Sequence, residues 1–137
     1  MEEIILLDNI KYHHLTLTDE EQLEKIVQEH AADIFGKDSL YFNVKKKIKS
    51  KAGVASIPDG YLVCFSDPPI WYIIEIELSI HPVFNHIVAQ ANRFLNGIKN
   101  QSSLRQILTA LDEEIEDNPV LEKFIADRIG RKYIKVP

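Results

Sequence analysis

Cysteine is nearly absent from this chain of 137 residues, in which Cys64 is the single one. An internal disulfide and a zinc site built from cysteine thiolates are therefore both excluded. Apolar runs are also short, and none approaches the ~20 residues that a membrane-spanning helix needs. The first residues lack the basic stretch and the longer apolar core of a signal peptide. We therefore expect a cytoplasmic protein that does not associate with membranes.

Glycine is scarce as well, and none of the five glycines lies in a phosphate-cradling loop. No Ser/His/Asp triad or cysteine nucleophile is visible either. The apolar fraction of 45% and the charged fraction of 27% are ordinary for a globular protein. We expect a single domain over residues 1–137, with its core over about 19–100 and a helical extension over 101–137. The sequence leaves open whether a further segment follows Pro137.

The net charge of -5 argues weakly against nucleic-acid binding, but the charges are unevenly distributed. Five positive charges lie in a run of seven residues, namely Lys45, Lys46, Lys47, Lys49 and Lys51. Many acids lie elsewhere, in 19–29 and 112–127, and a polarised surface can bind phosphate despite a negative total. The run therefore predicts contact with a phosphate backbone, and its alternative interpretation is a solvated loop.

The first half of the chain predicts a short strand, a helix and then a group of strands. Glu3–Leu7 fits a short edge strand. Thr18 and Glu21 form a capping box, which predicts a helix that ends near Gly36. Ser39–Asn43 favours a strand, and a hairpin follows from two strands separated by turn residues, Val54–Phe65 and Ile70–Ser79.

The second hairpin strand has large apolar residues on both of its faces, which is typical of a central strand. After His81-Pro82 three helices are expected, the second from Ser102 or Ser103. Asn118-Pro119 begins the last helix and Gly130 ends it, and Arg131–Val136 fits a final strand. The order predicts an α/β fold in which a helix precedes a central mixed sheet flanked by helices, with a C-terminal helical pair.

Three acids near the hairpin are candidates for a metal site: Asp59, Glu75 and Glu77. The two glutamates point the same way from an otherwise apolar strand, and burying an unpaired charge costs several kcal/mol, roughly. Mg²⁺ would compensate that cost, because it prefers oxygen ligands. A connection of three or five residues, such as Ser66–Ile70, sets Asp59 opposite Glu77 on the same face. The alternative interpretation places both glutamates on the surface of an edge strand.

These residues resemble the PD-(D/E)xK nuclease superfamily, which has the restriction-endonuclease-like fold. Pro58-Asp59 matches its Pro-Asp element, and Glu75-Ile76-Glu77 matches its acid-x-lysine element, with Glu77 at the usual lysine position. The resemblance implies that Asp59 and Glu75 bind Mg²⁺, for which Mn²⁺ can substitute, and that Glu77 completes the site or acts in place of the lysine. Lys49 or Lys51 is the alternative replacement for that lysine.

A second matching element lies on the helix that follows. RecB-like members of the superfamily carry Gln-x-x-x-Tyr there, and Gln90 with Phe94 matches this pattern. The resemblance makes Gln90 a catalytic-site residue. His86, Gln90 and Arg93 form a polar stripe that can hold a phosphate, or else an ordinary solvent face. Many members also use an acid of the first helix as a metal ligand, for which Glu29 is preferred here over Glu24.

Histidine offers a competing interpretation, in which His13, His14, His81 and His86 supply ligands to zinc. Adjacent His13 and His14 point to opposite sides of an extended chain and chelate poorly. His81 and His86 can approach Glu77, and a phosphate-contacting or packing role is preferred for them.

The sequence therefore predicts a metal-dependent nuclease that hydrolyses nucleic acid, DNA more than RNA. The first alternative is a catalytically inactive nucleic-acid-binding or regulatory module on the same scaffold. A further alternative is an interaction domain of a homodimer or of a larger repair or defence assembly, with the helical pair 103–129 as the partner surface.

Overall fold

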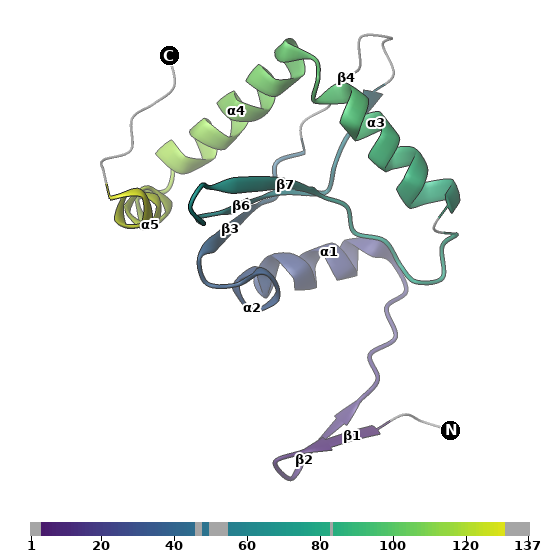
Figure 1. Cartoon of the computed structure of the whole chain (residues 1–137). Helices are drawn as coiled ribbons and strands as arrows, with labels where there is room; N and C mark the ends of the chain where they lie inside the picture. Colours follow the sequence, from purple (N-terminus) through teal and green to yellow (C-terminus); the bar gives the residue numbers. More distant parts are fainter. Residues whose placement is uncertain (1–3, 46–47, 50–54, 83, 131–137) are drawn as a thin grey trace.

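The computed structural model describes residues 4–45, 48–49, 55–82 and 84–130. Its centre is a three-stranded sheet in the order β3-β6-β7, formed by β3 (Ser39–Phe42), β6 (Gly60–Cys64) and β7 (Ile70–Ile74). Helices lie on both faces of this sheet (Figure 1). On one face are α1 (Glu20–Glu29) and α2 (Ala31–Phe35), and on the other are α3 (Ala89–Gly97) and α4 (Gln101–Glu116). The α/β class is therefore confirmed.

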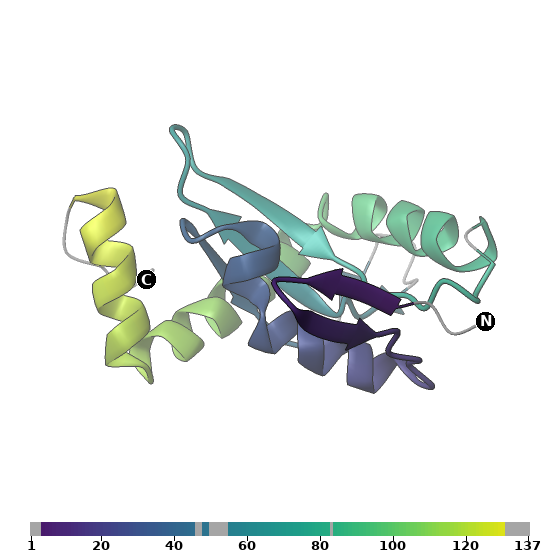
Figure 2. The same ribbon diagram turned by 90° about the horizontal axis from the view of Figure 1, so that it is seen from below.

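The remaining elements are short or peripheral. They are β1 (Ile4–Leu7), β2 (Ile10–His13), β4 (Ile48–Lys49), β5 (Ala55–Ser56), the π-helical turn η1 (Phe84–Val88) and α5 (Pro119–Ile129). Figure 2 shows α5 at the opposite end of the molecule from η1 and α3. No described helix combines the length and the apolar character that crossing a bilayer requires. The final strand expected at Arg131–Val136 lies outside the described residues.

The strand expected at the start of the chain is one half of a hairpin. β1 pairs with β2 through a turn at Asp8 and Asn9, which have φ values of 50° and 63°. Positive φ at both central residues is the geometry of a type I′ turn, which suits the twist of two antiparallel strands. The hairpin stands away from the body of the molecule (Figure 1), and its apolar side chains are exposed.

Side-chain caps set where α1 and α5 begin. Asp19, one residue later than the expected Thr18, caps α1 by accepting from the Gln22 amide at 2.8 Å. The expected continuous helix to Gly36 is interrupted at His30, between α1 and α2. The prediction for α5 is confirmed, since Asn118 caps it, Pro119 is its first residue and Gly130 follows in the left-handed conformation.

Two details of the predicted sheet are wrong. All the strand pairs in the described residues are antiparallel, so the sheet is not mixed. β6, not β7, is the central strand, and β7 lies at an edge with Ile70, Trp71 and Tyr72 exposed. Apolar residues on both faces of a strand do not reveal whether another strand lies on each side of it, so this pattern cannot distinguish an edge strand from a central one.

The hydrophobic core is formed by residues of strands β3 and β6 and of helices α3, α4 and α5. Tyr61 of β6 has no exposed surface, and it packs in one cluster with Phe42 and Phe94. The same cluster contains Ile107 and Ile115 of α4 and Ile125 of α5. The two C-terminal helices are therefore part of the main core of the domain.

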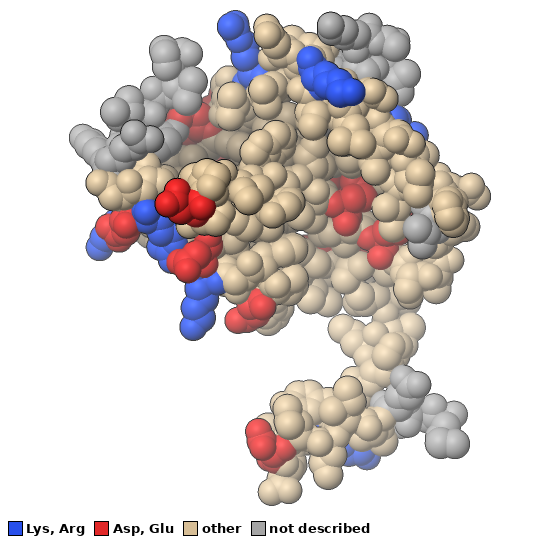
Figure 3. All heavy atoms as spheres, viewed as in Figure 1, with Lys and Arg blue, Asp and Glu red and all other residues tan. Residues whose placement is uncertain are grey.

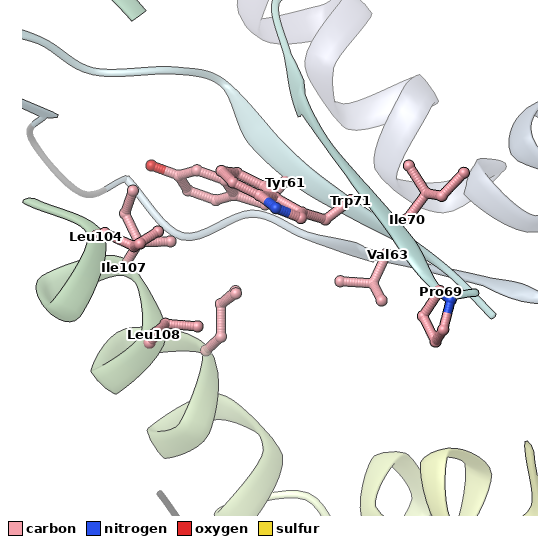
Figure 4. A pocket seen from close by; sticks show the side chains of 9 residues that line it. Tyr61, Val63, Pro69, Ile70, Trp71, Leu104, Ile107 and Leu108 are labelled. Atoms are coloured by element: carbon pink, nitrogen blue, oxygen red, sulfur yellow. The ribbon is translucent and has the colours of Figure 1, made fainter. Parts of the chain in front are cut away.

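An apolar pocket of about 380 Å³ lies between the sheet and α4 (Figure 4). Tyr61 and Trp71 line it from the sheet, and Leu104, Ile107 and Leu108 face them from the helix. Its lining contains no carboxylate, histidine or lysine. This pocket therefore has no groups for acid–base or metal chemistry, which directs attention to the other end of β7.

Candidate functional site

Asp59 is held in one position where β6 begins. Its Oδ2 accepts a hydrogen bond from the Ile76 amide at 2.7 Å, and its backbone carbonyl accepts one from the Tyr41 hydroxyl at 3.2 Å. The Ile76 amide thus donates to a side chain where a backbone carbonyl would continue the ladder. This explains why the regular strand β7 ends at Ile74 and not at Ser79 as expected.

The pairing of β6 with β7 places Asp59 beside the two glutamates. Gly60 lies opposite Ile74, so the same register sets Asp59 opposite Glu75. The connection between the strands has five residues, 65–69, an odd number as expected. The register differs from the expected one by two residues, because Glu77 was predicted to be the opposite residue. A two-residue shift preserves the face on which a side chain lies.

Gly60 allows this close packing around Asp59. A Cβ atom at residue 60 would lie 2.4 Å from the Tyr41 hydroxyl oxygen and 2.5 Å from its Cζ. We expect Gly60→Ala to lower the free energy of unfolding by about 1–3 kcal/mol, because the ring of Tyr41 must shift. Urea denaturation measures this loss. In a Tyr41→Ala background the same substitution should cost much less, and an unchanged cost would contradict the steric cause.

Lys45 connects Asp59 to the first helix. Its Nζ lies 3.0 Å from Oδ1 of Asp59 and 2.8 Å from Oε2 of Glu24. Burial lowers the pKa of Lys45, but its bonds to Glu24 and Asp59 outweigh that effect and raise the pKa above its usual value. Among the described side chains, Lys45 is the lysine that lies at the acids, whereas Lys51 and the side chain of Lys49, the proposed replacements, lie outside the described residues. Its ammonium is already paired, which differs from the free phosphate contact expected from the lysine run.

The pKa of Glu75 is raised by the surroundings of its side chain. Burial, followed by the negative charge of Asp59, raises the pKa of Glu75 to about 7, while a hydrogen bond from the Gln90 side chain and the charge of Lys45 oppose the rise. Oε2 of Glu75 and Oε1 of Gln90 are buried and have no hydrogen-bond partner in the structure. We call Glu24, Lys45, Asp59, Glu75 and Gln90 the carboxylate cluster.

The raised pKa of Glu75 has a consequence for stability in the absence of metal. In the unfolded chain this carboxyl ionises near the ordinary glutamate pKa of 4.5, whereas the folded carboxyl stays protonated until about pH 7. Between these values the folded state binds more protons, so stability falls as the pH rises. We expect Glu75→Gln to be more stable than the wild type above pH 7 and to lose this advantage near pH 4.

Urea denaturation in EDTA at pH 4, 5.5 and 8 measures this difference. Glu113→Gln is the control, because Glu113 is exposed on α4. A Glu75→Gln advantage that does not change with pH would contradict the assignment of the raised pKa to Glu75.

Glu77 belongs to a second group, the imidazole cluster of Glu20, Glu77, His81 and His86. Its side chain is 7% exposed, and its Oε1 contacts Nδ1 of His81 while its Oε2 lies 3.8 Å from Nδ1 of His86. Glu20 of α1 approaches the same His81 nitrogen at 2.7 Å. The three predicted acids therefore do not converge on one point. Glu77 contacts the two histidines, whereas Asp59 pairs with Lys45 and Glu75 with Gln90.

Local backbone structure brings the two histidines together. The His81 amide donates to the Leu78 carbonyl in a turn, and the His86 amide donates to the Pro82 carbonyl at the start of η1. The imidazole rings stack with their centroids 5.4 Å apart. Among the described residues, Glu77, His81 and His86 form the group of three possible ligands whose ligand atoms, one from each residue, lie within 4.8 Å of one another.

The other predicted site residues lie in different surroundings. Glu29 is exposed at the last residue of α1, and Glu24, the less favoured candidate, is the helix acid that reaches the carboxylate cluster. Arg93 is half-buried on α3, one turn beyond Gln90. Lys46, Lys47 and Lys51 lie outside the described residues, and of Lys49 only the backbone, in β4, is described.

A broad pocket opens beside Glu75, between β7 and α3. Its volume is about 600 Å³, and Glu75 is the one charged side chain among apolar lining residues such as Trp71, Tyr72 and Leu95. Figure 3 shows acidic side chains set into an otherwise uncharged surface in the region between α3 and α1. Glu75 is therefore within reach of a ligand that enters this pocket beside the exposed Trp71 and Tyr72.

Comparison of the chain with protein-family models, with curated proteins and with solved structures gives no match. The functional argument therefore depends on the residues of the two clusters.

Proposed function

We propose that this chain is a metal-dependent nuclease of the restriction-endonuclease-like fold, with Mg²⁺ or Mn²⁺ as its cofactor and DNA as its preferred substrate. The observation that carries the proposal is the placement of Asp59 and Glu75 opposite each other at the end of two paired strands, with a buried Glu75 oxygen that has no partner. Such an oxygen costs free energy unless a cation or a donor satisfies it.

The charges of the carboxylate cluster suit a divalent cation. Ionised Glu24, Asp59 and Glu75 carry three negative charges, and Lys45 supplies one positive charge, so two negative charges remain. Mg²⁺ is commonly held by one or two carboxylates, with water and substrate phosphate as the other ligands. Asp59 and Glu75 would hold it here, and no third protein ligand is needed.

Each residue of the cluster has a role in the proposed hydrolysis. The bound cation would lower the pKa of a water molecule and stabilise negative charge on the scissile phosphate. Gln90 orients the Glu75 carboxylate through its hydrogen bond. Lys45, whose side chain is 41% exposed beside Asp59, would contact the scissile phosphate. The other lysines of the run, together with Arg93, would bind the backbone without reading sequence.

The alternative function is a non-catalytic nucleic-acid-binding module. The ion pair of Lys45 with Asp59 favours it, because an ammonium ion already neutralises one of the two proposed metal ligands. The two functions differ in their need for a divalent cation.

Cleavage of a supercoiled plasmid and of a labelled single strand, each with Mg²⁺, Mn²⁺ or EDTA, tests the proposal. We expect product with either metal and none in EDTA. Intact DNA that is bound equally well in Mg²⁺ and in EDTA would favour the non-catalytic module.

A further inference from the structure

The imidazole cluster has a ligand chemistry different from that of the carboxylate cluster. Two imidazole nitrogens and two carboxylates meet there, whereas the carboxylate cluster offers mainly oxygen ligands. Mg²⁺ prefers oxygen alone, but imidazole suits zinc and the neighbouring transition metals.

Two carboxylate oxygens crowd one nitrogen in this cluster. Nδ1 of His81 lies 2.7 Å from Oε1 of Glu20 and also contacts Oε1 of Glu77. An imidazole nitrogen carries at most one proton, so it cannot donate fully to both acids. A shared cation would satisfy both acids and both nitrogens at once.

The ligand atoms of Glu77, His81 and His86 lie close enough together for one zinc ion. One atom from each lies within 4.8 Å of the others, and Oε2 of Glu77 lies 3.8 Å from Nδ1 of His86. Bonds of about 2.1 Å from zinc to nitrogen or oxygen place two tetrahedral ligands about 3.4 Å apart. Glu20, whose Oε1 lies 2.7 Å from Nδ1 of His81, would supply the fourth ligand.

The imidazole cluster is also separate from the proposed Mg²⁺ site. Glu75 and Glu77 are two residues apart in an extended segment, which corresponds to about 6.6 Å along the backbone. The ions of a two-metal catalytic centre lie about 3.5–4 Å apart. Gln90 of α3 contacts Glu75, whereas Glu20 of α1 contacts Glu77, so the two glutamates have different partners.

We propose that Glu20, Glu77, His81 and His86 form a site for a transition-metal ion of the zinc type, which links α1 to η1 and to the segment between β7 and η1. The metal would fasten the first helix beside the carboxylate cluster, because Glu20 and Glu24 lie one turn apart on α1. This inference goes beyond the proposed nuclease function and does not depend on it.

Calorimetric titration of the full chain with zinc chloride tests the proposal. We expect one ion per chain, with affinity reduced at least tenfold, roughly, in His86→Ala and in His81→Ala. Glu20→Gln should also weaken binding, and because it is conservative in shape it separates ligand loss from misfolding. His30→Ala is the matched control, since His30 lies at the other end of α1.

Two results would overturn the zinc site: no heat of binding with the wild type, or equal affinity in the wild type and both histidine variants. Displacement of zinc by millimolar Mg²⁺ would also overturn it, because an imidazole site does not favour magnesium. Asp59→Asn should bind zinc as the wild type does. That variant therefore distinguishes failure of this site from failure of the nuclease proposal.

Discussion

Asp59→Asn is expected to slow Mg²⁺-dependent cleavage by about 10²–10³-fold. The reason is electrostatic: a neutral amide binds a divalent cation poorly, and metal stabilisation of a transition state is worth several kcal/mol, with each 1.36 kcal/mol equal to a factor of ten. Asparagine retains an oxygen that can accept from the Ile76 amide, so the strand end should keep its structure.

Rates of plasmid nicking over a range of Mg²⁺ concentrations measure this loss, with thermal unfolding as the check on folding. Asp33→Asn is the control, because the Asp33 side chain is 81% exposed on α2. Cleavage at the wild-type rate by folded Asp59→Asn would remove Asp59 from the site and with it the nuclease proposal.

Short-range patterns of the sequence predicted the elements near this site. The Pro58-Asp59 element directly precedes β6, the odd connection keeps Asp59 and Glu75 on one face, and Gln90 lies beside Glu75 as the glutamine helix implied. These relations follow from the two-residue period of strands and from the order of elements along the chain. They do not require knowledge of distant contacts.

The partners of each acid could not be predicted, because they depend on packing between distant segments. Lys45 was one of five lysines in a run, and only the folded chain places it between Glu24 and Asp59. The choice of Glu24 over Glu29 depends on the rotation of α1 about its axis. The sequence contains one signal for the orientation of this helix, because Glu20 and Glu24 are four residues apart and therefore share a helix face.

The position of β7 at the sheet edge shows a second limit. Apolar residues on both faces of a strand do not reveal what lies beside the strand. In this chain β7 has β6 on one side, and its apolar residues Ile70, Trp71 and Tyr72 remain exposed at the sheet edge. The predicted core stops near residue 100 because the recognisable motifs stop there. The burial of residues in α4 and α5 depends on apolar side chains that belong to no motif.

Ile107→Ala is the second substitution with a large expected effect, because it tests whether α4 belongs to the core. Ile107 is 2% exposed and packs in the cluster with Tyr61 and Phe94. Truncation of such a residue costs about 2–5 kcal/mol, a large part of the 5–15 kcal/mol that a domain typically has. Leu108, the next residue, is 43% exposed, so Leu108→Ala should cost less than about 1 kcal/mol.

Urea denaturation of the two variants decides between two roles for the C-terminal helices. If they were only a surface for a partner, both substitutions would change stability little and deletion of 101–137 would leave a folded chain that no longer self-associates. In this structure α4 and α5 supply Ile107, Ile115 and Ile125 to the core cluster, so deletion should expose Phe94 and Tyr61 and unfold the domain. A stable, folded truncation would contradict that role and would indicate that the two helices form a surface for a partner.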